Sequence, residues 1–390
     1  TDFNDLHASE GLPAVAMQLD GEIAKSVVDE NAAVRAAADG NVVDAATGKK
    51  AGKPSPPEPD WEVFWQIVNR FTYVYPTDTA YDHVLGDFVK IEHMRLKFSP
   101  RYVQMWLGST KRRDVDLPNV VFDPSDKTPS PKLNLFRGLA VPPAEEAIGC
   151  ENLLRLLFLL CNEDDKVFDW TLKWLAYPLQ HLGAKMQTAL VFSGKEGAGK
   201  NLFFGVVRDI YGTHGGVITQ RQLENDFNLW LSAKLFLVAN EVVTRTEMRH
   251  HVGFLKNLIT EPEIWINRQN KDHRREANHC NLLFFRHELQ PPPISPDDRR
   301  YLVVKTPGAP STDKGRALYK DVVAETDADG AAALHRYLLD LDLGDFGPHT
   351  KPIMTGAKRD LIELGLNGAQ LFWQDLHDAE VPLPYCPARV

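Results

Sequence analysis

The 390-residue chain alternates between short apolar runs and segments in which apolar residues recur at helical spacing. Between residues 186 and 306, five continuous apolar runs predict buried strands, and helical patterns lie between them. The runs are Ala189–Phe192, Val217–Thr219, Leu235–Ala239, Leu282–Phe285 and Tyr301–Val304. Strands that are apolar on both faces and alternate with helices are typical of a parallel sheet covered on both sides. The pattern therefore predicts an α/β core with a mostly parallel five-stranded sheet.

The segments on either side of this core follow other patterns. Residues 61–148 mix short strand-like and helical pieces and predict a small α+β domain, in which Arg101–Trp106 fits either a strand or a short helix. Residues 149–185 predict two helices, and the first is buried because Leu153–Leu160 is apolar nearly all round. Residues 307–390 are mainly helical, with Pro and Gly breaks. The expected helices there are Ala331–Leu339, Thr355–Leu364 with Thr355 as its N-cap, and Gln370–Leu376.

The N-terminal region differs from the rest in composition. Residues 1–38 continue from a short acidic motif into an alanine-rich helical stretch, and residues 39–60 are rich in Gly, Lys and Pro. A Pro-rich composition of this kind predicts a semi-extended linker. Because the chain starts at Thr1 in mid-pattern and stops in Pro-rich coil, we interpret it as a fragment of a longer protein.

Composition and charge narrow the classes of function. A hydrophobic content of 43% with 25% charged residues is typical of a globular protein. With a net charge of −9, any contact with nucleic acid must come from a local basic patch. The four cysteines form no C-x-x-C pair, which favours a reducing compartment. No signal peptide is visible and the longest apolar run is too short to span a bilayer, so we expect a cytoplasmic protein with no membrane partner.

Residues 194–200 carry the strongest chemical signal. They fit the pattern G-x-x-x-x-G-K, directly after the first predicted strand and before a helical pattern. Glycines in such a loop let backbone N–H groups surround a phosphate chain, and the helix N-terminus adds partial positive charge. Lys200 is then placed to reach the β- and γ-phosphates, so the loop predicts ATP binding unless it is a glycine turn that arose by chance. The loop consists of Gly194, Lys195, Glu196, Gly197, Ala198, Gly199 and Lys200.

A second set of polar residues follows the predicted strand 235–239, which ends in Asn240-Glu241. An apolar strand that delivers an acidic residue at its C-terminal end is a Walker B arrangement, in which Glu241 would be the base that activates water. Asn201 takes the place of the usual Ser or Thr after the loop lysine, and Asn240 that of the usual first acid. We therefore predict a Mg²⁺ site of Asn201, Asn240 and Glu241, partly through water and less anionic than usual. The alternative is a strand that merely ends in polar residues.

Residues 263–281 predict a hairpin with a basic tip. Ile264 and Ile266 alternate with Trp265, and turn-forming residues follow before the chain returns to the next strand. The tip holds more basic than acidic residues, which suits contact with a phosphate backbone. The basic candidates for DNA binding are Arg268, Lys271, Arg274 and Arg275. A solvated loop is an interpretation of nearly equal weight on the residues alone.

Two other clusters carry weaker signals. His273, His279, Cys280 and His287 lie close together in the sequence, but their spacing matches no established zinc pattern. Lys111-Arg112-Arg113 would suit a phosphate contact, although the acidic residues that follow at once favour a solvated turn.

Arg299 and Arg300 precede the last predicted strand of the core. Arginines at such a position can reach the γ-phosphate on an adjacent subunit as a finger. Alternatively they pair with Asp297, Asp298 or other surface carboxylates.

Taken together, residues 189–304 resemble the superfamily 3 helicase core found in primase-helicases of phages, plasmids and integrated elements, a group that includes DUF5906-like sequences. The motifs that carry the resemblance are the loop 194–200, the strand ending in Asn240-Glu241, Leu255–Thr260 before the hairpin, and Asp298-Arg299-Arg300. The segments Val121–Pro124, Leu133–Gly138 and the tail around Pro352–Lys358 are also similar to that group. Residues 1–20 resemble the end of a Toprim primase domain.

The resemblance and the patterns together give the expected domains. They are the C-terminal end of a Toprim-like primase domain (1–38), a linker (39–60), a small α+β domain (61–148), a helical segment (149–185), the superfamily 3 helicase core (186–306) and a helical C-terminal region that is cut short (307–390).

The resemblance also implies a mechanism. It implies an AAA+-like P-loop NTPase fold, hexameric rings with ATP and Mg²⁺ between subunits, and 3′-to-5′ translocation on single-stranded DNA. Lys271 and His273 of the hairpin would enter the ring pore, His287 stands where the family has a sensor Asn, and Arg299 or Arg300 would be the finger. A primase domain in the same longer chain and the cytoplasm of a bacterial host are implied as well.

Three functions remain open on the sequence. The first is an ATP-driven replicative DNA helicase. The second is a P-loop ATPase that does not unwind DNA and acts as a DNA-binding or assembly switch, which the amides Asn201 and Asn240 favour. The third is a small-molecule phosphotransferase, which would leave the basic hairpin and the arginines at 299 and 300 without a purpose.

Overall fold

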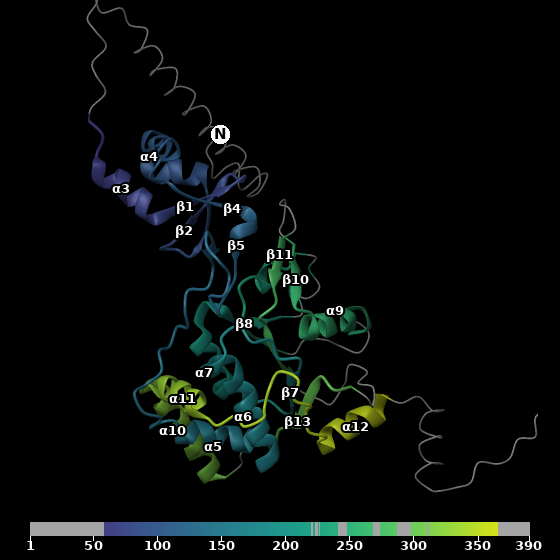
Figure 1. Ribbon diagram of the computed structural model, residues 1–390. Coiled ribbons are helices and arrows are strands. Elements are labelled where there is room, and N and C mark those ends of the chain that lie inside the picture. The colour runs from purple at the N-terminus through teal and green to yellow at the C-terminus, as the bar shows by residue number, and fades with distance from the viewer. Residues whose placement is uncertain are drawn as a thin grey trace, which may run out of the picture. The chain divides into compact units, whose positions relative to one another are not determined.

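The computed structural model of the protein describes residues 58–219, 221–222, 225, 227–240, 248–267, 274–286, 298–309 and 312–365 (Figure 1). The chain divides into two units, residues 1–62 and residues 63–390. The expected end of a primase domain, most of the expected linker and the expected helix Gln370–Leu376 lie outside the described residues. Among the helices that are described, none is long and apolar enough to cross a lipid bilayer.

A small mixed sheet precedes the core. Its elements are α3 (Trp61–Arg70), β1 (Phe71–Tyr75), β2 (Thr79–Asp82), β3 (Asp87–Lys90), α4 (Ile91–Leu107) and β4 (Arg113–Asp116). Within the described residues the strand order is β3-β2-β1-β4, with β1 antiparallel to β2 and parallel to β4. Arg101–Trp106 belongs to α4, so this segment is a helix and not a strand. Phe64, Ile67, Met94 and Trp106 share one buried cluster that joins both helices to the sheet.

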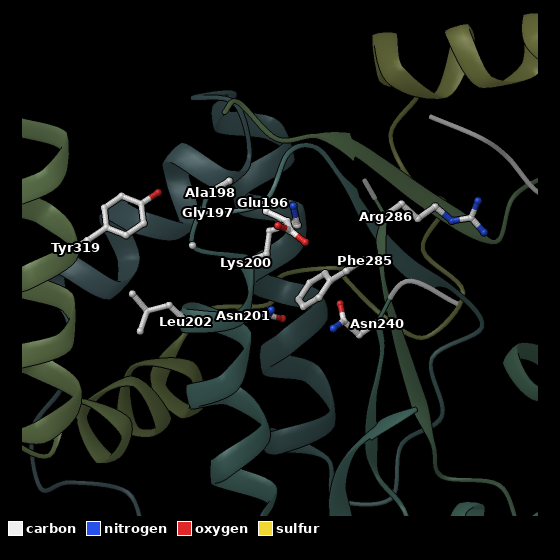
Figure 2. Close-up of a pocket in the computed structure, with 11 residues that line it drawn as sticks. Glu196, Gly197, Ala198, Lys200, Asn201, Leu202, Asn240, Phe285, Arg286 and Tyr319 are labelled. Carbon is white, nitrogen blue, oxygen red and sulfur yellow. The ribbon is translucent and has the colours of Figure 1, made fainter. Parts of the chain in front are cut away.

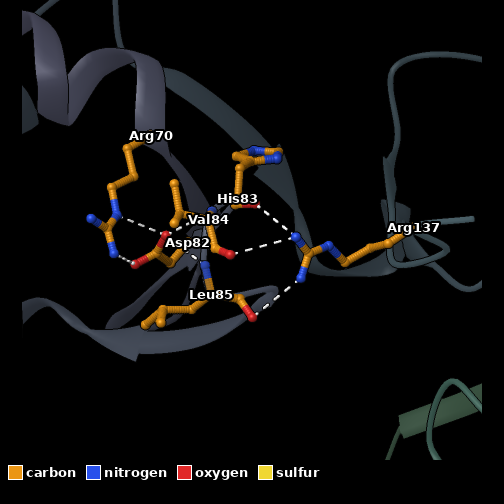
Figure 3. Close-up of polar contacts among 6 residues, drawn as sticks. All are labelled: Arg70, Asp82, His83, Val84, Leu85 and Arg137. Atoms are coloured by element: carbon orange, nitrogen blue, oxygen red, sulfur yellow. Dashed lines mark hydrogen bonds and ion pairs between the residues drawn. The ribbon is translucent and has the colours of Figure 1, made fainter. Parts of the chain in front are cut away.

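Polar contacts fix the turn that follows β2 (Figure 3). Arg70 donates two hydrogen bonds to the Asp82 carboxylate, at 2.8 and 2.7 Å. Arg137 lies after the short parallel pair β5 (Val120–Val121) and β6 (Leu133–Asn134). Its guanidinium donates to the backbone carbonyls of His83, Val84 and Leu85, at 3.4, 3.5 and 3.3 Å. The turn is therefore held from two sides.

A parallel sheet forms the centre of the core. Its strands are β7 (Ala189–Ser193), β8 (Gly215–Ile218), β9 (Phe236–Asn240), β12 (Asn281–Arg286) and β13 (Tyr301–Lys305). In the described part of the chain their order is β13-β7-β12-β9-β8, and every neighbouring pair is parallel. The prediction of a mostly parallel five-stranded sheet is thus confirmed, with each strand within two residues of its expected position.

Helices cover both faces of this sheet, which explains the continuous apolar runs. On one face Leu190 and Phe192 join the buried cluster that includes Phe203 of α7 (Lys200–Tyr211). On the other face Val191 and Val303 join the cluster of α9 (Met248–Thr260) and α12 (Gly356–Gly365). Because successive strand residues point to opposite faces, both sets must be apolar.

Four more helices share the buried cluster of α7. They are α5 (Glu151–Leu160), α6 (Asp165–Gln180), α10 (Asp313–Asp327) and α11 (Gly330–Asp340). The predicted helix pair before the core is confirmed as α5 and α6, and Trp170 and Trp174 of α6 are buried, as a core position requires. The Thr355 hydroxyl accepts a hydrogen bond from the backbone N–H of Lys358 at 3.1 Å, which confirms the predicted N-cap of α12.

The predicted hairpin is also present. Its strands β10 (Glu263–Ile266) and β11 (Arg274–Ala277) are antiparallel, and Trp265 pairs with Arg275. Of the predicted tip, residues 268–273 lie outside the described residues.

Candidate functional site

The loop between β7 and α7, residues 194–200, is built on three glycines with positive φ. The φ angles are 150° at Gly194, 78° at Gly197 and 85° at Gly199. A side chain at Gly194 would come within 2.6 Å of the backbone oxygen of Thr306. These are conformations and approaches that residues other than glycine rarely accept, so the glycine pattern is required by the shape of the loop. We call residues 194–200 the glycine loop.

Lys200 begins α7 and folds back across the glycine loop. Its ammonium donates hydrogen bonds to the backbone oxygens of Gly194 at 2.8 Å and Lys195 at 3.0 Å. The charge is thereby held at the centre of the loop, next to the positive end of the α7 dipole. A fixed cation at a helix N-terminus favours an anionic ligand.

A cavity of about 470 Å³ opens at the glycine loop (Figure 2). This volume suits a ligand of nucleotide size. The cavity is lined by Glu196, Gly197, Ala198, Gly199, Lys200, Asn201, Leu202, Asn240, Phe285, Arg286 and Tyr319. The structure thus brings Asn201 and Asn240, which the sequence predicts as site residues, to the same cavity as Lys200.

Strand order explains why Asn240 reaches this cavity. β12 lies between β7 and β9, and Phe285 pairs with Phe192 on one side and with Asn240 on the other. The end of β9 is therefore two strand spacings, about 10 Å, from the end of β7. Amide oxygens are suitable ligands for Mg²⁺, directly or through water, so Asn201 and Asn240 fit a magnesium site. Glu241, the predicted base, lies outside the described residues.

Arg286 also borders the cavity, at the end of β12. Its side chain points away from Lys200 in Figure 2. Burial lowers its pKa to about 10, against the opposing effect of Tyr301. The guanidinium therefore stays charged at neutral pH. His287, which the family resemblance places in the sensor position, is the next residue and lies outside the described residues.

Tyr319 comes to the cavity from α10, more than a hundred residues after the glycine loop. A side chain on Gly199 would come within 3.0 Å of its ring, so the tyrosine packs against the loop backbone. Burial raises the pKa of its hydroxyl. No sequence motif predicted Tyr319, Leu202, Phe285 or Arg286 as residues of the site. The one available signal was for Phe285 and Arg286, because Phe285 ends a predicted core strand and Arg286 follows it directly.

Arg299 and Arg300 lie at the other end of the sheet. The backbone oxygen of Arg300 accepts a hydrogen bond from the N–H of Ala189, the first residue of β7. The glycine loop follows the last residue of β7, about 13 Å further along the strand. Within one chain, the two arginines and the cavity are therefore separated by the length of the sheet.

The two arginines differ in their surroundings. Arg300 pairs with the buried carboxylate of Asp298 at 3.3 Å, as the alternative interpretation of the sequence allows. The ammonium of Lys358, itself buried in α12, donates to the backbone oxygen of Asp298 at 2.8 Å. Arg299 is exposed.

The predicted basic surfaces lie partly within the described residues. Arg275 of the hairpin is exposed and contacts Glu263 at 3.4 Å, while Arg274 belongs to β11. Arg268, Lys271 and His273 lie outside the described residues. In the triplet 111–113, the guanidinium of Arg112 donates to the carbonyl of Leu107, and that of Arg113 to the carbonyl of Asn69.

The histidine and cysteine cluster around residue 279 also lies only partly within the described residues. The His279 ring bonds to the carbonyl of Gly183, and Cys280 is buried. His273 and His287 lie outside the described residues. In the described ranges, no three His, Cys, Asp or Glu side chains are grouped closely enough to hold a metal ion.

Comparison with known proteins relates this site to a family. A profile of a family of unknown function, DUF5906, matches residues 192–300, which run from the end of β7 to Arg300. The chain is homologous to part of the DNA primase-polymerase of Nitratiruptor phage NrS-1. The two are 31% identical over 179 residues, which is 44% of this chain and 24% of the relative. The chain therefore spans about a quarter of the length of this curated relative.

Two solved structures share the fold. The apo structure of the NrS-1 C-terminal region aligns with a TM-score of 0.66 and 21% identity, over 83% of this chain and 79% of that one. The A-form apo structure of the same region gives a TM-score of 0.65 at 21% identity, over 82% and 78% of the two chains. The predicted resemblance is thus confirmed in part, by homology to a phage primase-polymerase and by the fold of its C-terminal region, whereas the superfamily 3 helicase core stays a prediction.

Proposed function

We propose that the glycine loop binds the phosphates of ATP and that the chain is the motor region of a replicative DNA helicase. The observation that carries the proposal is Lys200, whose ammonium is held inside a loop of positive-φ glycines at the start of α7. The loop borders a cavity large enough for a nucleotide. These features together support a P-loop ATPase more than a glycine turn without a ligand.

The residues around the cavity have separate roles in binding and hydrolysis. Lys200 and the N-terminus of α7 bind the β- and γ-phosphates, and Tyr319 with Leu202 gives an apolar side that accommodates the base. Asn201 and Asn240 supply oxygens for Mg²⁺, which when bound would neutralise part of the phosphate charge. Glu241 follows Asn240 in the chain and orients the attacking water as its base.

Hydrolysis requires a second copy of the chain. Arg299 and Arg300 are a sheet length from the cavity of their own chain, so they reach the γ-phosphate only on a neighbouring subunit. This supports a ring, for which the family resemblance gives a hexamer. In such a ring the basic hairpin tip, with Lys271 and His273, contacts single-stranded DNA and moves along it from 3′ to 5′.

The name of the homologous phage protein supports DNA as the nucleic acid on which this chain acts. That protein is a DNA primase-polymerase, and this chain matches part of it. We infer that the chain acts in replication in a bacterial host, with a primase domain in the same longer polypeptide.

A second function is favoured by one observation. Two uncharged amides, Asn201 and Asn240, line the cavity, whereas the P-loop pattern leads one to expect a hydroxyl and an acid there. A weaker magnesium site would give a P-loop protein that binds ATP as an assembly or DNA-binding switch and hydrolyses it slowly. ATP turnover with strand displacement distinguishes the helicase from the switch.

The test is the substitution Lys200→Ala. Removing the cation that contacts the β- and γ-phosphates should reduce ATP turnover by at least about a hundredfold, the loss typical when one transition-state donor is removed. The measurement is phosphate release with and without single-stranded DNA, with circular dichroism to establish folding. Lys166→Ala, at an exposed position of α6, is the matched control and should keep full turnover. A folded Lys200→Ala protein with normal turnover would refute the proposal.

A further inference from the structure

The hairpin presents one large aromatic side chain to solvent. Along β10 the residues alternate, so that Ile266 is buried and Ile264 packs against the same core, while Trp265 faces outward. The Trp265 side chain is 57% exposed. Single exposed apolar residues are common on protein surfaces, so a role for Trp265 in binding depends on the groups around it.

A cation lies against this indole. Arg275 stands opposite Trp265 in the strand register, and its guanidinium carbon is 4.8 Å from the centroid of the ring. The same guanidinium contacts the carboxylate of Glu263 at 3.4 Å. The ring is therefore oriented by a neighbour on the opposite strand, and it still has more than half of its surface in water.

The backbone beneath the indole is anchored to the core. The Asn228 side chain donates to the carbonyl of Trp265 at 2.7 Å and accepts from the N–H of Asn267 at 2.6 Å. On the other strand the buried carboxylate of Glu276 accepts from Ser232 and from the N–H of Ala233, at 2.8 and 2.5 Å. Both strands are thus fixed, and the indole is presented by a rigid support.

The surroundings favour a nucleobase as the ligand. The connection between the two strands is basic, with Arg268 and Lys271 among its residues, which complements a phosphate backbone. Aromatic rings in basic grooves bind single strands by stacking on bases, whereas the bases of a duplex already stack on each other. The neighbouring Phe227 and Leu229 are exposed as well, at 39% and 51%.

We propose that Trp265, oriented by Arg275, is a base-stacking platform for single-stranded DNA at the foot of the hairpin. This inference rests on the proposed function, because it assumes that the chain binds DNA. The platform contacts a base, whereas the residues expected at the hairpin tip contact phosphates.

The experiment separates stacking from phosphate binding. Two labelled oligonucleotides of equal length are compared by fluorescence anisotropy, one of oligo(dT) and one with abasic sites in place of the bases. Wild-type protein should bind oligo(dT) more tightly. Trp265→Ala should weaken oligo(dT) binding by about five- to one-hundred-fold, as expected for the loss of one base stack, and should leave abasic binding unchanged. Trp265→Phe, which keeps a ring, should retain most of the preference.

The control is Trp61→Ala, at a tryptophan of α3 that is 56% exposed and lies outside the hairpin. It should bind both oligonucleotides like wild type. Equal wild-type binding to the two oligonucleotides, or a preference that survives in Trp265→Ala, would overturn the stacking platform and leave the helicase proposal intact. Wild-type protein that binds neither oligonucleotide would refute the DNA part of the proposed function and the platform with it.

Discussion

Asp82 is a buried carboxylate kept ionised by its neighbours. Its oxygens accept two hydrogen bonds from Arg70 and two from the backbone N–H groups of Val84 and Leu85, at 2.9 and 3.2 Å. Burial alone would raise its pKa, but these hydrogen bonds outweigh burial and the pKa is lowered. A group whose pKa is lower in the folded state stabilises the fold above its unfolded pKa.

Asp82→Asn should therefore destabilise the protein in a pH-dependent way. At pH 7 the variant loses the ion pair and leaves Arg70 without its partner, at a cost of about 3 kcal/mol in the free energy of unfolding. The difference in the free energy of unfolding between wild type and variant should decrease once the pH falls below about 4, where the carboxyl of the unfolded chain becomes protonated. It should go on decreasing until the pH passes the lower pKa of the folded state. Urea unfolding between pH 7 and pH 3 measures it. Asp78→Asn, in an exposed turn, is the control, and a difference independent of pH would contradict this account.

At the scale of elements, the N-terminus of α5 is capped by another helix. Its own N-cap residue, Cys150, makes no side-chain hydrogen bond to the helix. Instead the carboxylate of Glu325 in α10 accepts from the N–H groups of Asn152 and Leu153, at 2.8 and 2.9 Å. A negative charge there also complements the helix dipole. α10 carries Tyr319 as well, so the same helix supports α5 and borders the cavity.

Glu325→Ala should lower the free energy of unfolding by about 1–2 kcal/mol, because two N–H groups of α5 lose their acceptor. Equilibrium urea unfolding gives the value. Asp321→Ala removes an exposed acidic residue from the same helix and should change stability little. Equal effects of the two substitutions would show that Glu325 does not act as the cap.

At the scale of the whole molecule, the cavity and Arg299 lie at opposite ends of the sheet. If Arg299 acts on a neighbouring subunit, Arg299→Ala should reduce ATP turnover by about a thousandfold without loss of ATP binding or stability. Mixing Arg299→Ala with Lys200→Ala should restore part of the turnover, because some interfaces then combine an intact loop with an intact arginine. Arg300→Ala should instead lower thermal stability, since Arg300 pairs with buried Asp298.

Turnover after mixing and mass in solution with an ATP analogue test this prediction together. Lys320→Ala, at an exposed position of α10, is the control for mixing. A chain that stays monomeric under every nucleotide condition would exclude action between subunits.

Much of the core was predictable from the sequence because its signals are local. Five apolar runs predict five strands, and the spacing of Gly194, Gly197 and Gly199 predicts a loop whose φ angles need glycine. Arg101–Trp106 was ambiguous because six residues are too few to separate a period of 2 from one of 3.6. Its helical state follows from packing, since Val103 and Trp106 are both buried.

The residues that line the cavity are brought together by contacts between segments far apart in the chain, and no local sequence pattern predicts such contacts. Tyr319 reaches the glycine loop only because α10 packs beside α5, and Trp265 meets Arg275 only because the hairpin has one particular register. In the same way Glu325 caps a helix that begins more than 170 residues earlier.

By itself, the sequence determined the strands, the glycine loop, the lysine at its end and the polar residues after the third core strand. Hydrophobic period and glycine stereochemistry act between residues a few positions apart, so they can be read along the chain. Only the tertiary structure decided that β12 lies between β7 and β9, which residues border the cavity, and that Arg299 and Arg300 lie at the opposite end of the sheet. Those facts depend on which apolar faces bury each other, and many pairings of faces satisfy the same pattern.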